Sequence, residues 1–363
     1  MSLNTSNCEN VTSDDSRSDY EYWSTILLGV FTFIGTVGNV GLLLVVVSTK
    51  HLRTVANIMV VNLTVGDLLY LLISTPFHIE HDIHPSWQFG AIVCKLSQSG
   101  QVAAQGVCVL SLFAVSLERH QAITKPRVRS SEHNMLKTLA IVGVIWLVSV
   151  MFSTPIMILA DTQVPGCDPI CVYLPHFTPV AKAYTMSQFL ALYVLPLAAI
   201  SCFYVNMARV LLQSENNFKH ENQPGARQFM ARRRLAIIVL VITVLFGLLW
   251  LPYYAYNIWF QFNNFETALN DPVELERIYH MVFLFQQFHF FMGVGNSCVN
   301  PWVVFFMSST HRRELINAIL CRRSKTHDKR KYQPVRTTTP KSGETNHHNH
   351  DNTEQHELSQ TLL

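Results

Sequence analysis

Long apolar runs, separated by short polar stretches, dominate the chain. A helix needs about 20 mostly apolar residues to cross the roughly 30 Å hydrocarbon core of a bilayer. The segments that meet this requirement are residues 22–48, 57–77, 92–123, 136–159, 184–211, 235–260 and 278–307. The pattern therefore predicts an all-α membrane protein in which a seven-helix bundle occupies residues 22–307.

Composition agrees with a membrane protein, since the 363 residues are 49% hydrophobic and only 14% charged. Soluble globular proteins carry more charge than this. The net charge of +3 leaves no broad excess of lysine and arginine to neutralise phosphates, so we expect no nucleic-acid partner. The first twenty residues hold no apolar run, which predicts no removable signal peptide. The eight cysteines lack metal-ligand spacing, and we expect no metal site.

The distribution of charge predicts the orientation of the bundle. Basic residues follow the first, third, fifth and seventh spans, whereas the opposite loops, one of which contains Asp82, are mostly acidic. Because short cytoplasmic loops carry the excess of lysine and arginine, residues 1–21 are expected to form an extracellular tail on a multi-pass protein of the plasma membrane. Asn4 and Asn10 begin Asn-x-Ser/Thr triplets in that tail and are candidate glycosylation sites.

The chain changes character after Cys321, where apolar residues almost vanish. Residues 322–363 are therefore predicted to be a disordered cytoplasmic tail. Cys321 stands beside Arg322 and Arg323 and is a candidate for palmitoylation, with a free thiol as the alternative.

Two groups of ionisable residues stand inside or at the edge of the apolar segments. Asp67 lies within the second segment, where it is either hydrogen-bonding glue between helices or a buried ion or proton site. We expect Asn39, Asn296 and Asn300 near it. Glu118 and Arg119 end the third segment, where such a pair either marks the interface or has a functional role.

Three cysteines are expected on the oxidising side of the membrane near the third and fifth spans. Cys94 precedes the third span, and Cys167 and Cys171 precede the fifth. A disulfide could join Cys94 to either of them, and we favour Cys171. Cys8 and Cys167 then remain for an optional second bridge.

Motifs in most of the spans carry a resemblance to a known family. They are Gly38-Asn39, Asn62-Leu63 with Asp67, Trp87 and Gly90 before Cys94, Glu118-Arg119-His120, Trp146, Pro196 with Tyr204, Phe246 with Trp250 and Pro252, and Asn296 with Asn300-Pro301. From about residue 23 to 321 the chain resembles the rhodopsin-like (class A) G protein-coupled receptors.

The resemblance implies a short membrane-parallel eighth helix at 308–321 and a heterotrimeric G protein as partner. It also implies that arrestin and receptor kinases act through the tail, and that no cofactor is needed. The implied activation switch consists of Asp67, Glu118, Arg119, Tyr204, Trp250, Asn296, Asn300 and Pro301.

Besides His120, which replaces the tyrosine of the acidic-Arg-Tyr motif, three positions depart from the family pattern. Val304 replaces the tyrosine of the Asn-Pro-x-x-Tyr motif, and His311 stands where the eighth helix usually opens with phenylalanine. Cys108 replaces a serine of the family's sodium site, which would lie near Asp67.

Within the family, the chain looks most like peptide receptors of the bombesin, CCHamide and endothelin group. The similar features are Asn296 to Pro301, Arg232 to Leu235 leading into Trp250-Leu251-Pro252, and Gln101. The resemblance implies a neuropeptide ligand and the phospholipase C and calcium branch of signalling. Phe290 and Phe260 stand where bombesin receptors carry arginine.

Polar residues of the third span indicate the kind of ligand. No acidic residue lies between Lys95 and Leu117, which argues against an amine, because a buried cation requires a carboxylate. Glutamines at 101 and 105 instead suit the amide groups of a peptide. The candidate ligand-binding residues are Gln98, Gln101, Gln105, Tyr253, Tyr254, Asn257, Gln286 and Phe290.

Other functions were weighed against a peptide receptor. One alternative is an orphan or constitutively active receptor without a peptide agonist. A remote alternative is an ion-coupled transporter that uses Asp67, but such a protein would show internal repeats, which the sequence lacks. An enzyme is not expected, because no acid–base pair, metal cluster or nucleophile constellation is visible.

Overall fold

The computed structural model describes residues 19–49, 52, 54–84, 86–124, 135–164, 169–175, 177–218, 224–263 and 272–320. Several predicted features lie outside these residues. They are the glycosylation sites Asn4 and Asn10, the second disulfide of Cys8 and Cys167, the lipidation site Cys321, and the tail at 322–363.

Helices form nearly all of the described structure. The first four spans are α1 (Asp19–Ser48), α2 (Val55–Leu69) with its continuation η3 (Tyr70–Ser74) and α3 (Thr75–Ile83), α4 (Gly90–Thr124), and α5 (Met135–Leu159). The remaining spans are α6 (Pro179–Phe189) with η4 (Leu190–Val194) and α7 (Leu195–Phe218), α8 (Pro224–Phe262), and α9 (Pro272–Met307). The short helix α10 (Ser309–Ile319) follows.

Within the described residues, seven helical stretches are long and apolar enough to cross a membrane, which confirms the predicted fold class. Several helices are longer than the apolar segments that predicted them. The second span reaches Ile83 rather than residue 77, and the sixth begins at Pro224 rather than residue 235. Hydropathy marks only the part inside hydrocarbon, whereas polar residues beyond it still form helical hydrogen bonds.

Side-chain caps define the starts of three helices. The hydroxyl of Thr54 accepts a hydrogen bond from the amide of Asn57 at the start of α2. Thr178 does the same before α6, where Pro179 takes the first helical position. Ser308 caps α10. Each cap satisfies an amide that the helix itself leaves without a partner.

Two spans contain a π-helical turn, and each turn lies just before a proline. The turn η3 ends two residues before Pro76, and η4 ends two residues before Pro196. Proline lacks an N–H donor and its ring crowds the carbonyl four residues earlier, so regular α-helical bonding is interrupted there. Neither turn was predicted from the sequence.

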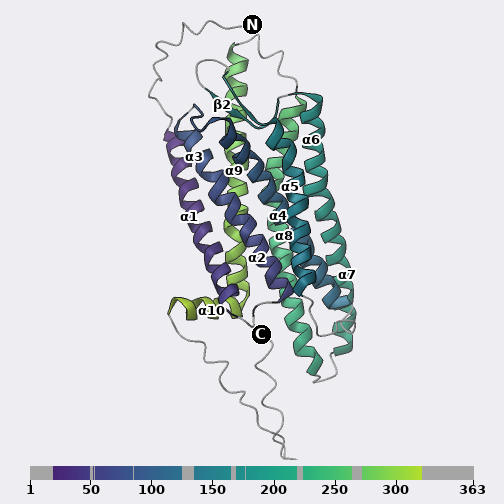
Figure 1. Cartoon of the computed structure of the whole chain (residues 1–363). Helices are drawn as coiled ribbons and strands as arrows, with labels where there is room; N and C mark the ends of the chain where they lie inside the picture. Colours follow the sequence, from purple (N-terminus) through teal and green to yellow (C-terminus); the bar gives the residue numbers. More distant parts are fainter. Residues whose placement is uncertain are drawn as a thin grey trace, which may run out of the picture.

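The helix α4 lies at the centre of the bundle, in contact with α2, α5, α7 and α8. Around it, α1 packs against α2 and α9, and α8 packs against α9. Figure 1 shows α10 lying across one end of the bundle, where it contacts α1 and α9. Large apolar side chains such as Phe33 and Phe306 remain exposed, as expected for surfaces that face lipid.

A small antiparallel hairpin, not predicted from the sequence, lies at the other end of the bundle (Figure 1). Its strands are β1 (Asp161–Gln163) and β2 (Ile170–Val172), with Thr162 opposite Cys171. We call this the hairpin end, and the opposite one the α10 end. Trp87 ties the start of α4 to this region, because its amide donates to the Pro169 carbonyl and its indole to that of Gly90. Gly90 has a φ of 72°, which favours glycine.

Candidate functional site

A disulfide fixes the hairpin to the top of α4. Cys94 is bonded to Cys171, which confirms the favoured pairing. Because Cys94 is fully buried and Cys171 belongs to β2, the bond holds the hairpin over the end of the bundle. The hairpin therefore forms a cover above the candidate ligand-binding residues of α4.

Three of those residues are the glutamines of α4, whose spacing of three and four places them on one helix face. Gln98 is half-buried, with its Nε2 3.8 Å from the sulfur of Cys171. The side chain of Gln101 lies close to the hydroxyl of Tyr70. Gln105 is 2% exposed, and its Nε2 has no hydrogen-bond partner among the described residues. The three amides thus run from the disulfide down into the bundle.

The candidates on α8 separate into two directions. Tyr253 faces the bundle interior, with its hydroxyl 3.4 Å from that of Tyr173 and its ring against Trp250. Tyr254 is instead packed on the rings of Phe189 and Tyr193, at 5.7 and 4.8 Å, in the segment α6–η4. These contacts make Tyr254 part of the packing between α8 and the fifth span.

The remaining ligand-binding candidates lie on α8 and α9. Asn257 is half-buried and donates to the carbonyl of Tyr253. Gln286 is half-buried on α9. Phe290 is 5% exposed and lies under the ring of His78, with a centroid separation of 3.7 Å. Of the α9 candidates, Phe290 is therefore the one that packs into the interior.

Tyr173 belongs to the same end of the bundle, although it was not among the candidates. Its hydroxyl donates to Oε1 of Gln188 at 3.0 Å. Burial raises the pKa of Tyr173 well above its ordinary value, so the phenol stays protonated and remains a donor. Tyr173 follows β2 directly, and no sequence motif pointed to it.

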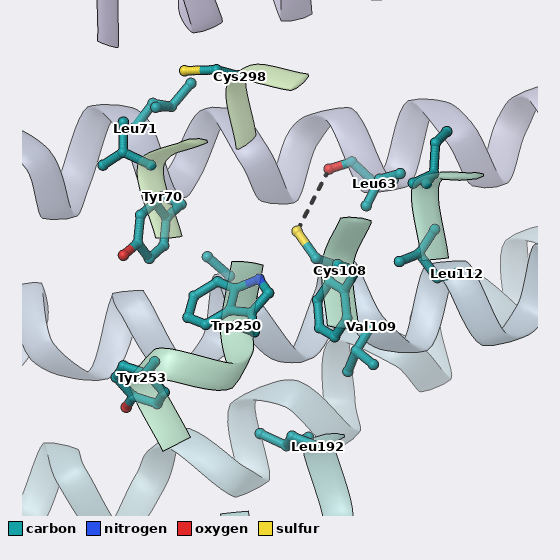
Figure 2. Close-up of a cluster of buried hydrophobic side chains, with 14 of the residues drawn as sticks. Leu63, Tyr70, Leu71, Cys108, Val109, Leu112, Leu192, Trp250, Tyr253 and Cys298 are labelled. Atoms are coloured by element: carbon teal, nitrogen blue, oxygen red, sulfur yellow. Dashed lines mark hydrogen bonds between the residues drawn. The ribbon is translucent and has the colours of Figure 1, made fainter. Parts of the chain in front are cut away.

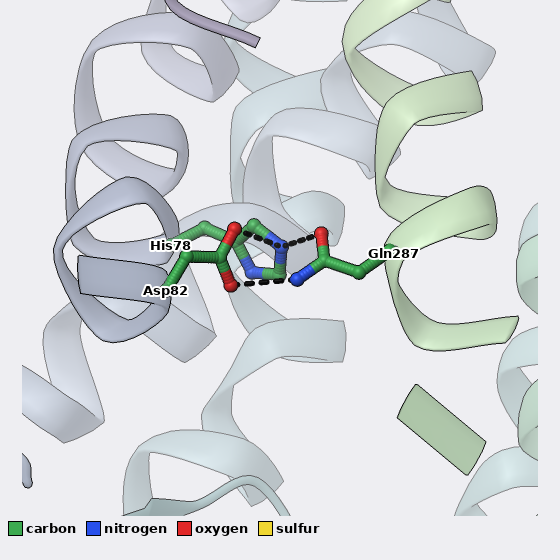
Figure 3. Close-up of polar contacts among 3 residues, drawn as sticks. All are labelled: His78, Asp82 and Gln287. Carbon is green, nitrogen blue, oxygen red and sulfur yellow. Dashed lines mark hydrogen bonds and ion pairs between the residues drawn. The ribbon is translucent and has the colours of Figure 1, made fainter. Parts of the chain in front are cut away.

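A polar cluster between α3 and α9 was also missed. Figure 3 shows His78, Asp82 and Gln287 directed toward one another. Nε2 of Gln287 donates to Asp82 at 2.6 Å, and Nε2 of His78 lies 3.2 Å from Oε1 of Gln287. The Asp82 side chain is only 4% exposed. The sequence placed Asp82 in an acidic loop because it lies beyond the apolar segment, but the helix continues and carries it into the interface.

Asp67 lies near the middle of the bundle and is fully buried. Its carboxylate accepts hydrogen bonds from Nδ2 of Asn300 at 2.9 Å and from the thiol of Cys108 at 3.5 Å. Of the three amides expected nearby, only Asn300 hydrogen-bonds to it within the described residues. Asn39 donates instead to the carbonyls of Gly35 and Ser297.

Asn296, the third of these amides, is 1% exposed, and its side chain has no hydrogen-bond partner among the described residues. The surroundings of Asp67 also bear on the family's sodium site. A hard cation such as sodium is bound through oxygen ligands. Cys108 offers a thiol where a hydroxyl is usual, and this donor set fits sodium poorly.

Trp250 is buried among aromatic rings and is 2% exposed. It contacts Phe246 at 6.1 Å, Tyr253 at 5.5 Å and Tyr70 at 5.6 Å. Figure 2 shows the indole between Tyr70 and Cys108. Its Nε1 has no hydrogen-bond partner within the described part of the chain. A ring held by ring contacts alone can shift without breaking hydrogen bonds.

The remaining switch candidates lie toward the α10 end. Nε of Arg119 lies 2.8 Å from Oε2 of Glu118, and both side chains are largely buried. Tyr204 packs against the buried cluster of Ile123, Met207 and Ala236. Pro301 is buried inside α9, directly after Asn300.

Two further contacts lie at this end, one between α8 and α9 and one at the start of α10. Nε of Arg234 donates to the Met307 carbonyl at 3.0 Å, which connects α8 to the end of α9. His311, which replaces the usual phenylalanine, has its Nδ1 2.7 Å from the hydroxyl of Ser308. Val304 is buried and apolar. The substitutions at 304 and 311 are thus accommodated within the packing of α9 and α10.

Comparison with known proteins agrees with this architecture. A family model described as 7 transmembrane receptor (rhodopsin family) matches residues 38–303. Bombesin receptor subtype-3 of Ovis aries is 31% identical over 304 residues, which cover 82% of this chain and 74% of that receptor. The neuropeptide CCHamide-1 receptor of Drosophila melanogaster is 30% identical over 317 residues, which cover 84% of this chain and 62% of that receptor.

The family match extends from the first span into the seventh and includes the buried Asp67, the Glu118–Arg119 pair and Trp250. Proteins of this family are receptors and not enzymes. The chain therefore belongs to the rhodopsin family of seven-transmembrane receptors, and it is a G protein-coupled receptor similar to those of the bombesin group.

Proposed function

We propose that this receptor binds a neuropeptide at the hairpin end, which faces the outside of the cell. The observation that carries the proposal is the row of glutamines at 98, 101 and 105 beneath the tethered hairpin. Amide side chains can both donate to and accept from a peptide backbone. The names of the two relatives, a bombesin receptor and a CCHamide-1 receptor, support the same class of ligand.

Aromatic rings next to the glutamines complete the proposed site. Tyr253 on α8 and Phe290 on α9 border the interior. The ring of Tyr253 contacts that of Trp250, and the ring of Phe290 contacts that of Tyr70. Apolar and aromatic walls with a few polar groups are typical of ligand sites. In this proposal Gln286 and Asn257 line the outer rim, and Tyr254 supports the site from behind.

The proposed signal is a change in the population of two bundle packings. A ligand that binds one packing more tightly shifts the equilibrium toward it. In the resting packing Glu118 holds Arg119, as in the contact at 2.8 Å. In the active packing Arg119 is released to contact the G protein, while Trp250 and Tyr204 change position. Asp67, Asn296, Asn300 and Pro301 form the region of α2 and α9 that rearranges.

The proposed pathway is the phospholipase C and calcium branch, which similarity to the bombesin receptor supports. We further propose that the receptor resides in the plasma membrane with its amino terminus outside. Arrestin and receptor kinases would act on residues 322–363, which lie outside the described part of the chain.

The test is calcium release from cells that express the full chain, challenged with a neuropeptide panel that includes bombesin and CCHamide-1. At least one peptide is expected to raise calcium in a saturable manner. The control is Arg119→Ala, which should reach the cell surface and bind the peptide but fail to stimulate nucleotide exchange. Signalling that is high without any peptide and unchanged by the panel would favour a constitutively active receptor instead.

A further inference from the structure

Tyr70, which no motif singled out, lies where the proposed ligand site meets the proposed switch. It is the first residue of η3, 2% exposed, and three positions beyond Asp67 in the same span. Its ring meets Trp250 edge to face, with centroids 5.6 Å apart and planes at 83°. The other side of the ring is stacked on Phe290 at 6.0 Å and 30°. Figure 2 shows the Tyr70 ring beside the indole.

The hydroxyl of Tyr70 occupies a space that α9 leaves open for it. A Cβ atom added at Gly293 would lie 2.5 Å from this hydroxyl oxygen and 3.2 Å from Cζ of the same ring. It would also lie 3.7 Å from Cη2 of Trp250. Any residue larger than glycine at 293 must therefore displace Tyr70. Gln101 of α4 lies close to the same hydroxyl.

One side chain thus contacts α4, α8 and α9 at the same depth of the bundle. Two of its neighbours, Gln101 and Phe290, belong to the proposed ligand site, and the third, Trp250, belongs to the proposed switch. A buried ring in a close-packed interior cannot move without its neighbours, since interiors pack as densely as organic crystals. Displacement of Gln101 or Phe290 therefore moves the ring that bears on Trp250.

We infer that Tyr70 is a positioning residue that transmits ligand contact to Trp250, and that Gly293 is required to admit its hydroxyl. The inference rests on the proposed function, because it takes the ligand and switch residues from it. A purely structural role would stabilise the fold without altering the balance between the two packings. The two roles can be separated by measuring that balance directly.

The test follows the opening of the α10 end in the purified full-length receptor, without peptide or G protein. Ala236 on α8 is 4% exposed and packs with Ile123 and Met207. In an Ala236→Cys background, a water-soluble methanethiosulfonate reagent modifies position 236 only when α8 moves away. The rate of modification at that residue is measured by peptide mass spectrometry, so that other cysteines do not contribute.

Gly293→Ala is expected to raise this rate on the order of fivefold, since a shift of about 1 kcal/mol between packings changes their ratio by that factor. Tyr70→Phe removes the oxygen that the new methyl group meets, so Tyr70→Phe/Gly293→Ala should return to within about twofold of Tyr70→Phe alone. The matched control is Gly295→Ala, because a Cβ there meets nothing within 4 Å. That control should leave the rate unchanged.

The inference is overturned if Gly293→Ala behaves like Gly295→Ala, or if Tyr70→Phe does not relieve its effect. If Gly293→Ala fails to fold, Tyr70→Leu replaces it, with Tyr193→Phe as control. The leucine variant should then raise the rate by a similar factor, and a change under twofold would overturn the inference. Because no peptide enters the assay, this outcome is independent of whether the neuropeptide proposal holds.

Discussion

Neutralising Glu118 is expected to raise signalling in the absence of ligand. Oε2 of Glu118 lies 2.8 Å from Nε of Arg119, and the two side chains are 13% and 10% exposed, so solvent screens the pair only weakly. Arg119 stays charged when Glu118 is replaced by glutamine, so the glutamine oxygen can still accept a hydrogen bond and only the attraction between opposite charges is lost. That attraction contributes about 1 kcal/mol even in a partly exposed pair. The change Glu118→Gln therefore removes about 1 kcal/mol of preference for the packing that holds Arg119. If the pair is broken in the active packing, the active population rises about fivefold.

The assay is ligand-independent nucleotide exchange on a G protein, measured in membranes and divided by the amount of receptor at the surface. The matched control is Glu274→Gln, which removes the charge from a pair with Arg277 at 3.4 Å whose side chains are 45% and 69% exposed. Exposed pairs contribute little, so this variant should match the parent receptor. The reasoning is refuted if Glu118→Gln stays within twofold of the parent, or if both variants rise equally.

Three other changes test separate parts of the structure. Asn62→Leu removes the hydrogen bond from Trp146 and a second interhelical bond, and should lower the free energy of unfolding by about 1–3 kcal/mol; an unchanged melting temperature in detergent would contradict the network. Cys94→Ser and Cys171→Ser should reduce surface expression and peptide binding to the same extent, singly or together, and unequal losses measured by surface labelling would argue against a shared role. Asp67→Asn replaces one acceptor of the buried cluster by a donor and should alter agonist affinity or efficacy in concentration–response curves; if neither changes, Asp67 is only structural.

The spans were predictable because apolar length is a direct requirement of the bilayer. The same rule could not place their ends. Asp82 shows the consequence, since it was assigned to an acidic loop, whereas α3 carries it into contact with Gln287. Hydropathy reports where hydrocarbon ends and not where helical hydrogen bonding ends.

Composition alone could not decide whether Cys94 pairs with Cys167 or with Cys171. The β1–β2 pairing is what brings Cys171 to the start of α4, and a hairpin of two three-residue strands leaves little pattern in a sequence. Tyr70 was missed for a related reason. An aromatic residue in an apolar span looks the same whether it faces lipid or the interior, and only the packing of α8 and α9 distinguishes the two.

Among the site residues, Asn300 was predictable because a buried carboxylate needs a donor, and its motif suggested where one would come from. Asn39 satisfies backbone carbonyls instead, which depends on the exact approach of α1 to α9. Tyr254 illustrates the same limit, because adjacent tyrosines on one helix point in different directions. The spacing of adjacent residues on a helix predicts that Tyr253 and Tyr254 point in different directions, but it does not predict which of them faces the ligand.

The π-helical turn η3 makes the second span sensitive to a change in its length, which point substitutions would not reveal. Each residue of an α-helix advances the helical phase by about 100°, so the extra residue in the turn offsets the outer part of the span by that angle. Deleting one residue between 70 and 74 would restore a regular helix and swing His78 and Asp82 a quarter turn or more away from Gln287. Point substitutions here should thus be tolerated far better than a change in length, even though both leave the span equally apolar.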